Sequence, residues 1–193
     1  MSRRLFLGCP VPAQAAQALH RWSVAQWGDL PGVRVLAPVD LHATILFFGE
    51  VPEERLPWIL ELCRTLEWTP IEVRTGDLAV MGRTAIAIRL RSDSPVLGDL
   101  SELLGGGCAW TGGLAEASRH NLWCLTSACP ESDIQRARRR RRTGAAFELH
   151  VTLARAKTPP PMPAHAPGVA FTLDHAALYE SHLGPGGSRY AIL

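Results

Sequence analysis

A His-x-Thr motif that occurs twice, each time within a short apolar run, constrains the fold of this chain more than any other feature. The first copy is Leu41-His42-Ala43-Thr44, and the second, about a hundred residues later, is Leu149-His150-Val151-Thr152. Short runs rich in Ile, Val, Thr and Phe are typical of strands, so we expect strands over Leu41–Phe48 and Phe147–Ala154. The fold must therefore accommodate two strands that carry the same pair of polar side chains.

The alternation of side chains along a strand places each motif's polar residues together. His42 and Thr44 share one face of the first strand, and His150 and Thr152 share one face of the second. The apolar residues between them take the opposite face, which can be buried in a core. Two such strands facing across a groove would present two imidazoles and two hydroxyls to one site.

Length and composition favour one globular, water-soluble unit. The chain has 193 residues, 47% of them hydrophobic, which is enough for a sizeable core, and we expect a single domain over residues 1–193. A net charge of +2 favours no particular partner. No run approaches the roughly 20 apolar residues of a membrane span, and the stretch before Cys9 is too short for a signal peptide.

The cysteines indicate a reducing compartment. There are five of them, an odd number, and no two have CxxC spacing. This pattern argues against a disulfide framework and against a zinc site, so we expect a cytoplasmic protein.

Periodicity and turn residues predict the remaining elements. Further strands are expected at Arg4–Gly8, Val33–Leu36, Ile71–Leu78, Thr84–Leu90, Phe171–Tyr179 and Ser188–Leu193, and helices at Ala13–Trp27, Glu54–Trp68, Pro95–Leu104 and from Ser132 to Arg142 or Thr143. Glycines interrupt residues 105–130, which fit no continuous helix. The interleaving of strands and helices around a repeated motif suggests two similar lobes.

The flanks of both motifs resemble those of the two-histidine (2H) phosphoesterase superfamily. Residues 41–51, LHATILFFGEV, are similar to the first motif of the bacterial and archaeal RNA 2',3'-cyclic phosphodiesterases, historically called 2'-5' RNA ligases, and residues 147–155, FELHVTLAR, are similar to the second. The segments LYES and GSRY near the end resemble the family's closing strands. The resemblance implies an α+β fold of two similar lobes, each an antiparallel sheet backed by helices, with the active site in the cleft between them.

The resemblance also implies roles for individual residues. It assigns catalysis to four of them: His42, Thr44, His150 and Thr152. Arg155, three residues after the second threonine, would bind phosphate, and Phe47, five residues after the first histidine, would pack under a base or line the core. Leu149 departs from the family, which generally has proline before the second histidine. Apart from the resemblance, Tyr179, Ser181 and Tyr190 are expected to contribute to the packing of a lobe.

Two histidines fit the chemistry of opening a cyclic phosphodiester with water. One removes a proton from the water and the other protonates the departing ribose oxygen, and a free imidazole titrates near 6.5. We expect His42 as the acid and His150 as the base, although their order could be reversed. Hydroxyls from the threonines would stabilise charge on the phosphorus oxygens. This chemistry requires no cofactor and no metal, and a His-x-Thr spacing is not a familiar metal-ligand pattern.

The expected substrates are RNA ends or small cyclic nucleotides, acted on by a monomer without a membrane partner. Several alternatives use the same residues: joining of RNA through a 2'-5' linkage, hydrolysis of such a linkage, or a metal-dependent hydrolase built on His42 and His150. Another class is an RNA-binding protein without turnover. Its main RNA-binding surface would be the six arginines within residues 136–142, which could bind RNA phosphates.

Overall fold

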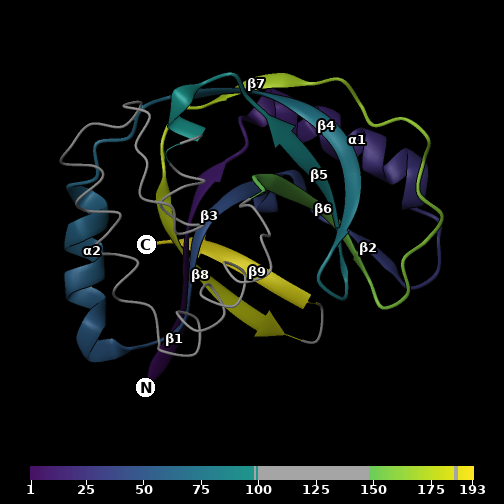
Figure 1. The fold of residues 1–193 in the computed structure, drawn as a ribbon. Coiled ribbons are helices and arrows are strands. Elements are labelled where there is room, and N and C mark those ends of the chain that lie inside the picture. Colours follow the sequence, from purple (N-terminus) through teal and green to yellow (C-terminus); the bar gives the residue numbers. More distant parts are fainter. Residues whose placement is uncertain (98, 100–147, 185–186) are drawn as a thin grey trace, which may run out of the picture.

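Nine strands form one curled antiparallel sheet in the computed structural model, which describes residues 1–97, 99, 148–184 and 187–193 (Figure 1). The strands are β1 (Ser2–Pro10), β2 (Val33–Val35), β3 (His42–Pro52), β4 (Ile71–Met81), β5 (Ala85–Arg91), β6 (His150–Ala156), β7 (Ala170–Leu173), β8 (Ala177–Gly184) and β9 (Gly187–Ile192). Their order is β7-β4-β5-β6-β3-β1-β8-β9, and β2 pairs with β6 beside this path. The predicted α+β class with antiparallel strands is confirmed.

The middle of the sheet is held by a short contact between β3 and β6. In the described part of the chain these strands pair at one position, where Ala43 lies opposite Val151. On one side of this contact lie β7, β4, β5, β6 and β2, and on the other lie β3, β1, β8 and β9. Hydrogen bonds join the two halves into one sheet. The expected division into two similar lobes, each with its own sheet, therefore stays a prediction.

The sheet curls because chain neighbours occupy distant positions in its order. Strand β7 forms one edge of the sheet, whereas β8, the next strand along the chain, lies beside β1 near the other edge. The link from Leu173 to Ala177 spans four peptide steps, which reach about 14 Å at most. The two ends of the sheet must therefore approach each other. The prediction of one strand over Phe171–Tyr179 was wrong, because residues 174–176 leave the first strand and cross to the second.

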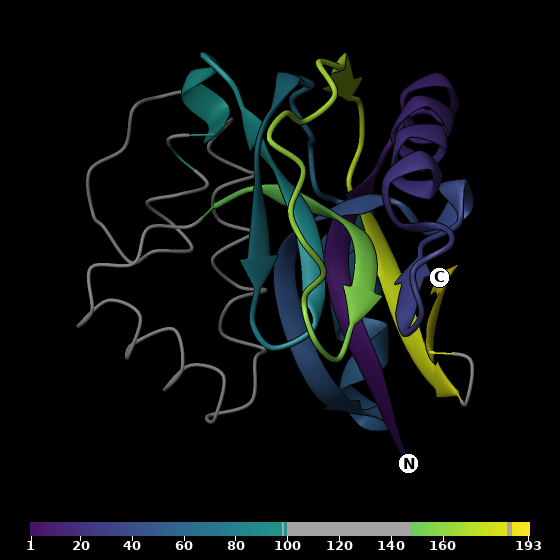
Figure 2. The same cartoon turned by 90° about the vertical axis from the view of Figure 1, so that its right-hand side faces the viewer.

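Helix α1 (Ala13–Trp27) has the bounds predicted from the sequence. It covers one face of the sheet. Its buried side chains, among them Leu19 and Trp27, join a core cluster with Leu5 and Leu7 of β1. Figure 2 shows α1 packed along one side of the sheet. We call the side that carries this cluster the core face.

Helix α2 (Leu56–Arg64) is shorter than the predicted Glu54–Trp68. A 3-10 turn, η2 (Glu53–Arg55), precedes it, and Pro57 lies in its first turn, where a missing N–H costs little. Thr65 caps the helix end, where both its N–H and its hydroxyl donate to the carbonyl of Glu61, at 3.1 and 3.0 Å. A second 3-10 turn, η1 (Pro38–Asp40), leads into β3.

Some predicted elements lie outside the described residues. Residues 95–97 are helical, as expected for the start of the predicted helix, but most of the rest of 95–104 is not described. The same holds for residues 105–130, for the helix predicted from Ser132 and for the arginine-rich residues 136–142. No helix within the described residues is long and apolar enough to cross a membrane.

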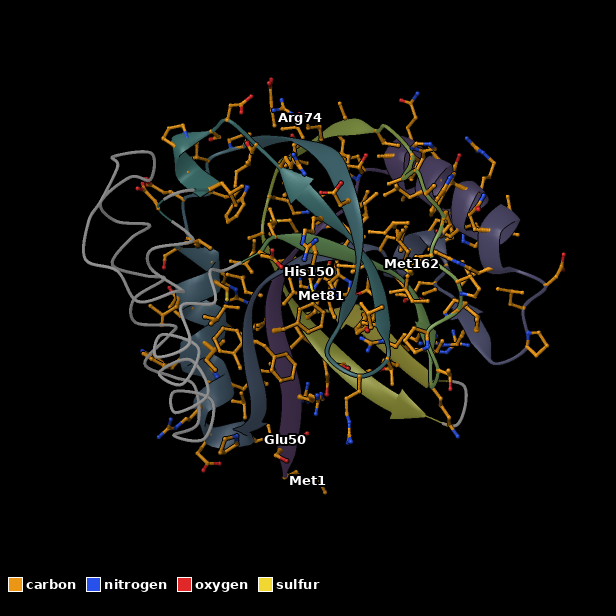
Figure 3. The ribbon with its side chains drawn as sticks, turned by 45° about the vertical axis from the view of Figure 1, so that its right-hand side comes forward. Met1, Glu50, Arg74, Met81, His150 and Met162 are labelled. Atoms are coloured by element: carbon orange, nitrogen blue, oxygen red, sulfur yellow. The ribbon has the colours of Figure 1, made fainter. Side chains whose placement is uncertain are left out.

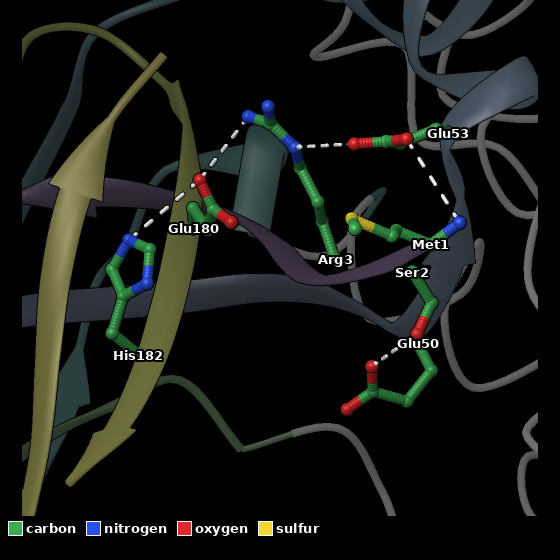
Figure 4. A network of polar contacts seen from close by, with 7 residues as sticks. All are labelled: Met1, Ser2, Arg3, Glu50, Glu53, Glu180 and His182. Carbon is green, nitrogen blue, oxygen red and sulfur yellow. Dashed lines mark hydrogen bonds and ion pairs between the residues drawn. The ribbon is translucent and has the colours of Figure 1, made fainter.

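Ion pairs hold the start of β1 against its neighbours (Figure 4). Arg3 Nη1 lies 3.3 Å from Glu180 Oε2 of β8, and Arg3 Nε lies 3.9 Å from Glu53 Oε1. His182 Nε2 lies 3.6 Å from the same Glu180 oxygen. Most of these side chains are substantially exposed, and such pairs contribute about 0–1 kcal/mol each. The buried core, rather than this network, must supply most of the stability of β1.

Candidate active site

The contact between β3 and β6 brings the two His-x-Thr motifs together. Ala43 and Val151 are both fully buried, so the histidine and threonine on either side of each point to the opposite face. Continuing the antiparallel register by one residue in each direction places His42 toward Thr152 and Thr44 toward His150. We call the face that carries these four residues the site face; Figure 3 labels His150 near the middle of the sheet.

Both histidines are oriented by the same local hydrogen bond. His42 Nδ1 lies 2.8 Å from the carbonyl oxygen of Asp40, and His150 Nδ1 lies 2.8 Å from that of Glu148. A carbonyl only accepts, so Nδ1 must carry a proton and donate it. In the neutral form of each ring, Nε2 then keeps a free lone pair. Each imidazole can thus accept a proton at Nε2 or, once protonated, release one there.

The two histidines differ in their surroundings. Burial lowers the pKa of His42 from 6.5 to about 4, against the opposing effect of its bond to the Asp40 carbonyl. The positive charge of Arg155 and the neighbouring His150 lower the pKa further. These charge effects place Arg155 and His150 close to the His42 ring. In the free protein at neutral pH, His42 is therefore uncharged.

Three aromatic rings from three strands bury His42. Its ring centre lies 4.7 Å from that of Phe6, 5.3 Å from Tyr179 and 4.6 Å from Tyr190. Phe6 is paired with Tyr179 in the register of β1 and β8, and their rings stack 4.8 Å apart. The sequence predicted both tyrosines only as packing residues. Their contact with His42 depends on strand pairing, for which the local sequence has no signal.

A β-bulge turns Phe47 onto the site face. Thr44 pairs with Gly8 but Leu46 pairs with Leu7, so Ile45 is an extra residue in β3. The bulge reverses the alternation, and Phe47 comes to lie opposite Phe6. Phe47 is 36% exposed, and the guanidinium of Arg4 lies 4.8 Å from its ring centre. Phe47 thus has an accessible aromatic surface on the face expected for base binding.

A second β-bulge, in β6, turns Arg155 onto the site face. Thr152 pairs with Ala87 but Ala154 pairs with Ile86, so Leu153 is the extra residue in β6. Arg155 is thereby placed on the face of His150 and Thr152. Its Nη1 makes a long contact of 3.5 Å with Thr84 Oγ1, and its buried Nε has no hydrogen-bond partner among the described residues. An unpaired buried donor of this kind suits an anionic ligand.

One further residue supports the second motif. Arg89 of β5 lies opposite His150, and its Nε lies 3.1 Å from Glu148 Oε1. The same Glu148 supplies the carbonyl that orients His150. Arg89 therefore helps to fix the start of β6, a role that the sequence did not indicate.

The described residues offer no ready metal centre. Within them, no three His, Cys, Asp or Glu side chains gather as a ligand set. Neither Thr44 nor Thr152 forms a side-chain hydrogen bond within residues 1–97, 99, 148–184 and 187–193, so both hydroxyls can serve a ligand. The arrangement can therefore combine two proton-transfer groups, two hydroxyl donors and one guanidinium.

Comparison with known families and proteins agrees with the resemblance noted in the sequence. Residues 10–90 match the model of the family described as LigT like phosphoesterase. The chain is 29% identical over 205 residues to a Thermus thermophilus protein named RNA 2',3'-cyclic phosphodiesterase; the match covers 98% of this chain and 87% of that protein.

Solved structures show the same fold. The crystal structure of TT0787 from T. thermophilus matches with a TM-score of 0.66 and 24% identity, over 98% of this chain and 94% of that one. E. coli LigT complexed with 3'-AMP matches with a TM-score of 0.60 and 20% identity, over 100% and 95% of the two chains. The family match confirms the resemblance noted in the sequence. The solved structures confirm the expected α+β fold with antiparallel strands.

Proposed function

We propose that this chain, which is similar to the LigT-like phosphoesterases, opens the 2',3'-cyclic phosphate at the end of an RNA and leaves a 2'-phosphomonoester. One observation carries the proposal: the pairing of Ala43 with Val151 gathers both His-x-Thr motifs at one place on the site face. The name of the T. thermophilus relative supports a substrate of this kind.

The reaction needs two proton transfers around one phosphorus atom. Water attacks the phosphorus while one histidine accepts its proton at Nε2. The bond from phosphorus to the ribose 3'-oxygen breaks, and the other histidine protonates that oxygen from its own Nε2. The products are a 3'-hydroxyl and a 2'-phosphate. The two histidines recover their starting protonation states when the accepting histidine releases its proton to solvent and the donating histidine takes one up. Each transfer typically contributes about 10²–10⁴-fold in rate.

The remaining residues of the site act on charge. Negative charge grows on the non-bridging oxygens as water adds, and the hydroxyls of Thr44 and Thr152 are available to donate to them. The unpaired Arg155 Nε supplies a charged donor on the same face. Phe47 provides an exposed ring against which the terminal base can stack.

The state of His42 in the free protein bears on the assignment of roles. With a pKa of about 4, His42 is neutral at pH 7 and its Nε2 can accept a proton. To act as the acid, as expected from the sequence, it must first be protonated, which requires the bound phosphate anion to raise its pKa. We propose His42 as the proton acceptor and His150 as the donor.

The test is incubation of the protein with an RNA that ends in a 2',3'-cyclic phosphate, in the presence of EDTA, followed by identification of the end group. We expect a 2'-phosphate, and a loss of at least about 10²-fold in kcat for His42→Asn and for His150→Asn. Asparagine retains an N–H donor for the Asp40 or Glu148 carbonyl but has no titratable nitrogen. The exposed His165→Asn is the matched control and should keep full activity.

Other outcomes would point to the alternatives. A 3'-phosphate product would reverse which ribose oxygen leaves, and loss of activity in EDTA would favour the metal hydrolase. RNA binding that survives both histidine substitutions, with no turnover by the folded wild-type protein, would replace the enzyme by the RNA-binding protein. Formation of a 2'-5' joined product from RNA halves would add ligation at the same residues.

A further inference from the structure

A second arginine stands next to Arg155 on the site face. Strand β2 pairs with β6 so that Arg34 lies directly opposite Arg155. Side chains at such directly opposed positions share a face, with Cβ atoms about 4.5–5.5 Å apart. The bulge at Leu153 places Arg155 on the face of the catalytic histidines, and Arg34 must therefore lie on that face as well.

The Arg34 side chain reaches across the site face toward the other half of the sheet. A Cβ added to Gly187, the first residue of β9, would lie 2.6 Å from Arg34 Cζ and 2.7 Å from its Nε. The guanidinium thus rests against the backbone of Gly187, whose φ of +97° also favours glycine. The same strand β9 carries Tyr190, which contacts His42. Arg155 and Arg34 therefore direct their charges to two different places, one at the histidines and one farther along β9.

The pair of arginines is not neutralised within the described part of the chain. No carboxylate forms an ion pair with Arg34 or Arg155 there, in contrast to Arg3, Arg74 and Arg91. Two like charges directly opposite each other in a sheet are destabilising. A bound anion would relieve this repulsion.

The positive charges on the site face indicate a substrate with more than one phosphate. A cyclic phosphodiester carries one negative charge, and its transition state gathers a second on the phosphorus oxygens. Arg155 and one protonated histidine already match those two charges. Arg34 is then in excess for a single phosphate, but it matches the phosphodiester that precedes the terminal nucleotide in an RNA strand.

We propose that Arg34 binds the phosphodiester on the 5' side of the terminal nucleotide, so that the preferred substrates are oligoribonucleotides rather than cyclic mononucleotides. This inference rests on the proposed cyclic phosphodiesterase function. Arg34 acts on specificity through a contact that only a longer substrate can make.

The test compares two dinucleotides that both end in a 2',3'-cyclic phosphate. In one the internal linkage is a phosphodiester, and in the other it is an uncharged methylphosphonate. A hydrogen bond to a charged group is worth enough that the wild-type protein should favour the charged dinucleotide about 10–100-fold in kcat/KM. Arg34→Gln should bring this ratio close to one, and Arg34→Lys should restore part of it. Arg21→Gln, on the exposed side of α1, should keep the wild-type ratio.

Salt dependence gives a second readout that a merely structural residue would not change. For dinucleotides that end in a 2'-phosphate, Arg34→Gln should reduce the slope of log Kd against log salt by about 0.7, the value for one lost contact to a single strand. A charge preference that persists in Arg34→Gln overturns the inference. Failure of the proposed function is a separate result, because the wild-type protein would then cleave neither dinucleotide. In that case the role of Arg34 would still be decided by binding, measured with the phosphodiester and the methylphosphonate dinucleotides that end in a 2'-phosphate.

Discussion

At the scale of the residue, His42 and His150 have the same hydrogen bond but different environments. Each donates from Nδ1 to the carbonyl two residues earlier, which leaves Nε2 for chemistry. His42 alone is enclosed by Phe6, Tyr179 and Tyr190, and its pKa falls to about 4. The difference between the two sites therefore comes from packing and not from the motif itself.

The low pKa of His42 predicts a stability that depends on pH. An unfolded histidine titrates near 6.5, so between about pH 4 and 6.5 the unfolded chain binds the extra proton. This contribution to stability is present above about pH 6.5 and is lost as pH falls toward 4. At pH 4.5 the wild-type protein should have lost about 2–3 kcal/mol from this group, a loss that His42→Asn should lack. Urea unfolding of both proteins at pH 7 and 4.5 measures it; parallel losses would contradict the low pKa.

The residual rate of His150→Asn separates the two assignments of acid and base. With the second imidazole gone, the pH dependence of kcat/KM reports His42 in the free protein. If His42 accepts the proton from water, this rate should rise with pH through the region of about 4–5 and then level off. A rate that instead falls over this region would restore the order expected from the sequence, with His42 as the acid.

At the scale of the element, two bulges decide which side chains reach the site. Strict alternation would place Phe47 and Arg155 on the core face, because both are an odd number of residues from the histidine of their motif. Ile45 and Leu153 each add one residue, and the later part of each strand changes face. The sequence predicted the two strands and the orientation of the four motif residues from alternation alone. It placed Phe47 and Arg155 in the site only by family resemblance, because an apolar run contains no signal for a bulge.

Arg34 of strand β2 is predicted to lower the stability of the protein while it contributes to substrate binding. Replacing Arg34 by glutamine removes the repulsion between like charges across β2 and β6, while the uncharged side chain still fits against Gly187. We expect Arg34→Gln to stabilise the protein by a few tenths of a kcal/mol, up to about 1 kcal/mol at low salt. Thermal unfolding at two salt concentrations measures this, with Arg21→Gln as the control. A destabilised Arg34→Gln would show that Arg34 serves mainly the fold.

At the scale of the whole molecule, the buried pair of Ala43 and Val151 joins the two halves of the sheet in the described part of the chain. Ala43 and Val151 are both fully buried and lie beneath the four motif residues. Neither the pairing nor the curl follows from the sequence, because both depend on contacts between segments that lie far apart along the chain. The chain's repeat predicts only that two similar strands exist.

Val151→Ala tests the importance of this pair. Removing two buried methyl groups should cost about 2–3 kcal/mol in the free energy of unfolding, from the lost burial and the cavity that remains. Because the pair sets the spacing of the motifs, kcat should fall as well, at a temperature where the variant is fully folded. The matched core control is Ile88→Val in β5, since Ile88 is equally buried and pairs with Val151. This control should cost about 1 kcal/mol and leave kcat nearly unchanged.

Each histidine lies opposite the other motif's threonine, so the two histidines are diagonal to each other, and this placement has a consequence for the direction of the reaction. By microscopic reversibility, a pair of imidazoles that can deliver and accept protons on opposite sides of a phosphorus atom serves ring opening and ring closure alike. What enters the acceptor position then selects the outcome. With the proposed RNA substrate, water would give a terminal phosphate, whereas a ribose hydroxyl of a second strand would give a joined RNA. On this proposal, hydrolysis and ligation are two occupancies of one arrangement, and the abundance of water determines the balance between them.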